Sequence, residues 1–130
     1  MAIDNQTNQH KALLEKYSLT NYGDDDVNHA NRPIAFLDLA ASEQHRLVDY
    51  CTQSFIQRAS PNHNWTSYGL KHLFENEATS SFYVSNGQFK GAMLIAGFFP
   101  VATETLNWVY RISPKSPALE KHNKLIMKGM

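Results

Sequence analysis

The sequence contains a single cysteine, Cys51, so it forms no internal disulfide and offers no thiolate-rich zinc site. No apolar run approaches the length needed to cross a bilayer, and the opening stretch MAIDNQTNQH lacks the apolar region of a signal peptide. A phosphate-cradling glycine loop, a catalytic carboxylate pair and a nucleophile motif are all missing. These absences predict a cytoplasmic protein that is not an enzyme and uses no membrane, metal or cofactor.

Charge of one sign is also lacking, since 12 Lys and Arg balance 12 Asp and Glu. The halves differ: residues 1–65 hold five basic and eight acidic side chains, and residues 66–130 hold seven basic and four acidic ones. A cationic face on the C-terminal half would suit nucleic acid. A domain dedicated to DNA binding is usually far more basic, however.

The composition, with 42% hydrophobic and 12% aromatic residues, is typical of one folded domain. We expect residues 1–32 to form an arm or linker with a helical stretch at 11–17, residues 33–113 to form the core, and residues 114–130 to form a basic tail. Three acids at 24–26 give the arm its negative charge. They favour a solvated linker over a mimic of a phosphate backbone, which is the alternative.

Apolar spacing predicts three helices in the core, over residues 42–59, 67–77 and 86–96. Ser42 is the predicted N-cap of the first helix, and Cys51 falls on its apolar face, where a buried and unreactive thiol is expected. Ser85 is the predicted N-cap of the third helix. Gly97 is well placed to end it.

Two strands complete the expected core. Residues 82–84 are rich in aromatic and branched side chains, and residues 106–112 alternate between apolar and polar ones, with Leu106, Trp108 and Tyr110 on the core side. The predicted fold class is therefore a mainly helical α+β domain with three helices and a small antiparallel sheet. Its order of elements resembles a winged helix-turn-helix, a family in which the third helix reads DNA.

Three stretches, SYGLKHLFE, FYVSNGQFKGAMLIAGF and NWVYRISPKSPA, resemble a pattern shared by small uncharacterised proteins of prophages and integrative elements in Gram-positive bacteria. The resemblance implies a protein of a mobile element. Some proteins with that origin inhibit host defences such as CRISPR nucleases, so it also implies an anti-CRISPR or other anti-defence activity. Fold-level likeness does not fix function, and both implications are expectations.

Candidate binding residues gather at the start of the third helix and beside the last strand. Asn86, Gln88 and Lys90 lie on the opening turn of the helix, where amide and amine side chains suit base edges or a protein partner. The competing interpretation is that this turn simply faces water. Further contacts with a phosphate backbone or a partner are expected from Lys71, Asn107, Arg111 and Lys115.

Two functions compete for this set of residues. In the first, the protein binds a host nucleic-acid-processing complex, such as a CRISPR effector, and blocks it; a neutral chain is no obstacle to that. In the second, it is a sequence-specific DNA-binding regulator or accessory factor of a mobile element that uses the third helix and the wing. Cationic contacts supply most non-specific DNA affinity, so neutrality counts against the second unless a homodimer doubles the contacts.

Overall fold

The computed structural model of the chain describes residues 2–19, 29–77 and 81–128, with side chains from residue 9 onward. Five α-helices, two short 3₁₀-helices and two strands lie in these ranges. They are α1 (Ala2–Tyr17), η1 (His29–Asn31), η2 (Pro33–Asp38), α3 (Ala41–Ser54), β1 (Gln57–Thr66), α4 (Ser67–Glu75), α5 (Asn86–Ile95), β2 (Val109–Ile112) and α6 (Pro117–Lys128). The fold is a mainly helical α+β arrangement with a two-stranded antiparallel sheet, which confirms the predicted class at that level.

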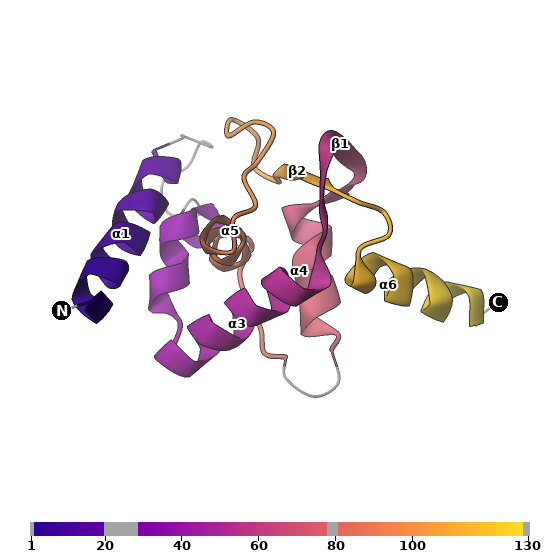
Figure 1. The fold of residues 1–130 in the computed structure, drawn as a ribbon, viewed down its shortest axis with the longest axis horizontal. Coiled ribbons are helices and arrows are strands. Elements are labelled where there is room, and N and C mark those ends of the chain that lie inside the picture. Colours follow the sequence, from indigo (N-terminus) through magenta and orange to yellow (C-terminus); the bar gives the residue numbers. More distant parts are fainter. Residues whose placement is uncertain (1, 20–28, 78–80, 129–130) are drawn as a thin grey trace.

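Helix α5 is the centre of the molecule. Figure 1 looks nearly along its axis, with α1, α3 and α4 arranged around it. Phe89, Ala92 and Met93 are fully buried, as their helical spacing predicts. The predicted cap is confirmed: the backbone N–H of Gln88 donates to Ser85 Oγ at 3.1 Å, and the Gln88 side chain accepts from the backbone N–H of Ser85 at 2.9 Å.

The N-terminal half of α5 is covered by the 3₁₀-helices. A Cβ atom on Gly87 would overlap the backbone of Arg32, and one on Gly91 would lie 2.5 Å from Cβ of Phe36. Only glycine therefore allows the backbone this close an approach at either position. A protein that reads DNA bases with its third helix keeps the start of that helix exposed. Here residues 31–36 cover this side of α5.

The sheet joins two distant parts of the chain. β1 pairs with β2 through Gln57 with Ile112, Asn62 with Tyr110, and Thr66 with Val109. Ten residues of β1 lie against four of β2, so β1 bulges twice between these pairs. Buried Asn62 supports the bulged region, since its Nδ2 donates to the carbonyl oxygen of Ile112 at 3.2 Å.

The structure corrects three boundary predictions. Helix α3 ends at Ser54, and residues 57–66 form β1, whereas a helix was predicted up to residue 59. Ser42 is not its N-cap, because the helix begins at Ala41 and the Glu43 side chain accepts from the backbone N–H of Ala40 at 3.0 Å. Residues 82–84, which were predicted to form a strand, belong to no strand.

Other predictions are confirmed in part. Helix α4 begins where expected, Gly97 ends α5 with a φ of 97°, and Cys51 is fully buried. Trp108, Tyr110 and Ile112 are buried as the alternation predicts, but Leu106 is 44% exposed. The strand starts only at Val109, so Leu106 belongs to the preceding loop.

The two ends of the chain contribute helices. Leu14 of α1 is fully buried, so α1 packs against the core, and α6 lies at the opposite edge of Figure 1. The acidic stretch 24–26 lies outside the described residues. Within the described part of the chain, no helix has both the length and the apolar character that a bilayer crossing needs.

Candidate functional site

A pocket of about 310 Å³ opens where the start of α5 meets α4 and the loop before β2. We call it the tyrosine pocket after Tyr68 and Tyr83, which are 44% and 77% exposed; Leu106, 44% exposed, also lines it. The polar side chains that line it are Asn31, Lys71, Ser85, Asn86 and Asn107. Three of the seven predicted site residues, Lys71, Asn86 and Asn107, therefore meet at one place.

Lys71 lies between the two tyrosines. Its Nζ is 5.4 Å from the ring centroid of Tyr68 and 5.0 Å from that of Tyr83, within the range of cation–π attraction. The ammonium also bonds both oxygens of Glu75, one turn further along α4, at 3.3 and 3.2 Å. Since Lys71 and Glu75 are both largely buried, the pair brings no net charge to the pocket.

Glu75 is fully engaged by the protein around it. Its carboxylate accepts from the backbone N–H of Val84 at 3.0 Å and lies 2.9 Å from Nδ1 of His72, in addition to its contact with Lys71. The first of these bonds anchors residues 82–84 to α4 and so positions Tyr83 beside Lys71. Three partners from two segments hold the carboxylate, which explains how a buried charge is tolerated there.

Asn86 fixes the base of the pocket. Its Oδ1 accepts from the hydroxyl of Ser67 at 2.7 Å, and its Nδ2 donates to Oδ1 of Asn107 at 3.0 Å, Oδ1 of Asn31 at 3.3 Å and the carbonyl oxygen of Leu106 at 3.2 Å. One buried amide thus joins α4, η1, α5 and the loop before β2. The arrangement is rigid because moving any of these segments would leave a buried polar group unpaired.

Lys90 lies beneath the pocket and does not reach it. Its side chain is fully buried, its Nζ donates to the backbone carbonyl of Asn31 at 2.8 Å, and the ammonium is 4.7 Å from the ring centroid of Trp108. Burial lowers the pKa of Lys90 to about 7. The prediction of a solvent-facing opening turn is therefore wrong for Asn86 and Lys90, because residues 31–36 cover that turn.

The remaining predicted residues lie elsewhere. Gln88 is occupied by the cap of α5, while Arg111 on β2 and Lys115 in the following turn are exposed and do not line the pocket. Sequence reasoning missed both tyrosines. The signal was the alternation Phe82, Tyr83, Val84: with its two neighbours turned inward, Tyr83 must face out.

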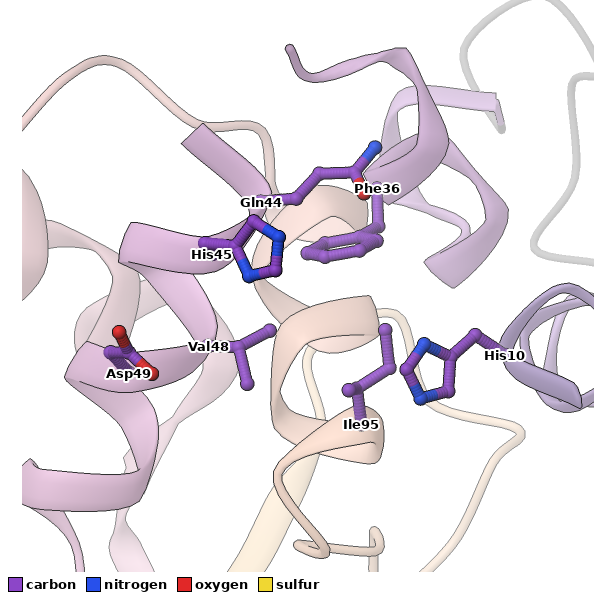
Figure 2. A pocket seen from close by; sticks show the side chains of 7 residues that line it. All are labelled: His10, Phe36, Gln44, His45, Val48, Asp49 and Ile95. Atoms are coloured by element: carbon purple, nitrogen blue, oxygen red, sulfur yellow. The ribbon is translucent and has the colours of Figure 1, made fainter. Parts of the chain in front are cut away.

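A second pocket, of about 320 Å³, lies between α1 and α3 (Figure 2). His10 and His45 point toward it from opposite sides, and Phe36, Val48 and Ile95 form an apolar floor. Gln44 at its edge donates to the carbonyl oxygen of Leu39 at 3.0 Å. Among the described residues, no group of three or more His, Cys, Asp or Glu is placed to hold a metal ion. This pocket contains none of the predicted site residues, so the tyrosine pocket is the better candidate.

Comparison with protein-family models, with curated proteins and with solved structures finds no match for this chain. The class that the fold and the site define is a small, mainly helical α+β protein with a neutral surface pocket of tyrosines and asparagines.

Proposed function

We propose that this chain is a non-enzymatic binding protein of a mobile element, that it grips a protein partner through the tyrosine pocket, and that its target is a host nucleic-acid-processing complex of the CRISPR-effector kind. It would act in the cytoplasm as an inhibitor. The composition of the pocket supports a protein as the partner. The resemblance to prophage proteins supports a host nucleic-acid-processing complex as the target.

The pocket has the composition of a protein-recognition surface. Tyrosine offers a large amphipathic contact area at a small cost in conformational entropy, and serine and asparagine offer adaptable hydrogen bonds; antibody binding loops are rich in all three. Tyr68 and Tyr83 supply the first kind of side chain, and Ser85 and Asn107 the second. Tyrosine is also among the residues that contribute most to binding energy at interfaces.

The burial and the ion pairing of the predicted site residues disfavour recognition of duplex DNA by α5. The order α3, β1, α4, α5, β2 is compatible with a winged helix-turn-helix core, and we propose that these elements form one. The N-terminal residues of α5 would then read bases. Asn86 and Lys90 are buried instead, and Lys71, the one cation among the described lining residues, is already paired with Glu75.

The test is inhibition of purified CRISPR nucleases in a DNA-cleavage assay. The wild-type protein should inhibit at least one nuclease of a panel, and Tyr83→Ala should weaken that inhibition by tenfold or more, since a hot-spot tyrosine contributes about 2 kcal/mol. Met127→Ala is the matched control, because it removes a side chain of similar exposure from the far end of α6. Thermal unfolding of both variants should match the wild type.

Two results would contradict the proposal. Inhibition that is equally strong in Tyr83→Ala and the wild type would separate the activity from the pocket. Tight binding to duplex DNA at physiological salt in a fluorescence-anisotropy titration, without inhibition of any nuclease, would make the chain a DNA-binding protein.

A further inference from the structure

Hydrogen-bond donors dominate the tyrosine pocket, and their arrangement follows from the bonds that Asn86 makes at its base. Oδ1 of Asn107 accepts from Nδ2 of Asn86 at 3.0 Å. The two ends of an amide lie on opposite sides of its carbon, so Nδ2 of Asn107 faces away from Asn86 and keeps its donors for an occupant. Oδ1 of Asn107 is therefore bonded within the protein, whereas its Nδ2 remains available to an occupant of the pocket.

Ser85 and Lys71 repeat the pattern. Oγ of Ser85 accepts from the backbone N–H of Gln88 at 3.1 Å, which leaves the hydroxyl hydrogen to donate. The ammonium of Lys71 has three N–H donors, and the two oxygens of Glu75 account for at most two of them. With the phenol groups of the two tyrosines, these side chains place five donor-bearing groups around one cavity.

Among the described lining residues, the side-chain amide oxygens are already bonded within the protein, which leaves the hydroxyl oxygens of Ser85 and the two tyrosines as side-chain acceptors. The carbonyl oxygen of Leu106 accepts from Asn86 at 3.2 Å. The carboxylate of Glu75, which pairs with Lys71, is also held by His72 and Val84 and is not part of the lining. The N–H groups of Asn107 and Lys71 can only donate, so an occupant that fills the cavity must supply acceptors for them, or it would leave these donors without partners at a cost in affinity.

We infer that the tyrosine pocket receives a carboxylate, the side chain of an aspartate or glutamate on the partner protein. A carboxylate offers about four acceptor sites and no donor, and hydrogen bonds to an ionised acceptor are roughly twice as strong as neutral ones. This inference rests on the proposed function, because it names the group with which a protein partner would enter the pocket.

A phosphate is the competing anion, and the charge of the site argues against it. Lys71 supplies the only ammonium among the described residues that line the pocket, and Glu75 neutralises it, whereas phosphate sites usually gather arginines, lysines or several backbone N–H groups. A single carboxylate needs less positive charge than a phosphate. The nucleic-acid alternative is therefore left as an outcome of the experiment.

The experiment is an NMR titration of the full chain with small probes. Amide proton–nitrogen spectra, including the side-chain NH₂ signal of Asn107, are followed during addition of glutamate capped as the N-acetyl α-amide. Capped glutamine, which has the same shape and no charge, and inorganic phosphate are titrated in parallel. Capped glutamate should give saturable shifts at the pocket with roughly tenfold higher affinity than capped glutamine, as expected for charge-assisted bonds.

Asn107→Asp is the decisive variant. It keeps the oxygen that Asn86 bonds and replaces the outward donor with a second, charged acceptor, so glutamate binding should fall at least about tenfold. Asn123→Asp makes the same chemical change on the exposed face of α6 and should bind glutamate like the wild type. Because Asn107 is itself exposed, neither variant should disturb the fold.

Any of three results would overturn the inference: no saturable shift with capped glutamate, equal affinity for capped glutamine, or tighter binding of phosphate at the same signals. The titration uses no partner protein. A negative titration combined with a loss of nuclease inhibition in Tyr83→Ala would reject the carboxylate and keep the proposed function. Saturable glutamate binding without inhibition of any nuclease would keep the carboxylate site and reject the proposed target.

Discussion

The buried ammonium of Lys90 predicts that the protein becomes more stable as pH rises above neutrality. The pKa of this side chain falls from 10.5 to about 7 because burial disfavours its charged form. Between these two pH values the unfolded chain carries a proton that the folded protein lacks. Folding then releases a proton, so the free energy of unfolding increases with pH across this window, and the contribution of Lys90 does not change with pH below or above it.

The size of the effect follows from the same two pKa values. Where the unfolded lysine is protonated and the folded one is not, the free energy of unfolding rises by about 1.4 kcal/mol per pH unit. Lys90 is half protonated in the folded protein near pH 7, so the gain between pH 7 and about pH 9 is about 2 kcal/mol. That is a large share of the stability of an ordinary domain.

Urea unfolding of the wild type and of Lys90→Met across this pH range is the assay. Methionine fills a similar volume without a charge, so the variant should lack this rise with pH. Near pH 7 it should be about 1–2 kcal/mol more stable, because the relief of charge burial exceeds the loss of the bond to the carbonyl oxygen of Asn31.

Lys124→Met, on the exposed face of α6, is the control and should retain the wild-type profile. Identical pH profiles for the wild type and Lys90→Met would refute the reasoning, since they would mean that Lys90 binds its proton equally well in both states.

Three further predictions concern the interior. Ser67→Ala removes the donor to Asn86 and the acceptor of the Trp108 backbone N–H, so it should lower the free energy of unfolding by about 2–4 kcal/mol in urea denaturation. Gly87→Ala should cost about 3 kcal/mol or prevent folding, as judged by circular dichroism, because its methyl group would overlap the backbone of Arg32. Burial raises the pKa of the Cys51 thiol, so a thiol reagent should label this residue only after denaturant unfolds the protein, and rapid labelling of the native state would contradict the packing of α3.

Local signals predicted the parts of the fold that are local. The cap at Ser85, the apolar face of α5 and the positive φ at Gly97 depend on neighbouring residues, and the structure confirms them. β1 was missed because Pro61 and two asparagines are typical of a loop. They are accommodated here because the strand bulges away from β2, a feature that depends on a segment more than forty residues away.

The burial of Lys90 shows what sequence patterns could not supply. A lysine on the first turn of a helix ordinarily faces water, and periodicity does not reveal which other segment will cover it. Two glycines four residues apart, Gly87 and Gly91, were the available signal, because small residues on one helix face permit a close neighbour. Three of the seven predicted site residues, Lys71, Asn86 and Asn107, line the candidate pocket, but its two tyrosines were not among the residues that the sequence singled out.

The pairing of β1 with β2 has a consequence for how the chain reaches this structure. The two strands bracket the segment that contains α4 and α5, so the sheet forms only by closing a long loop, a step with an entropic cost and a slow rate. A further hydrogen bond joins the segments beside the two strands: Oγ of Ser116, which follows β2, accepts from the backbone N–H of Ile56, which precedes β1, at 2.9 Å. The sheet therefore forms only once β2 and Ser116 are present, and the segment that contains α4 and α5 is then closed between the two strands.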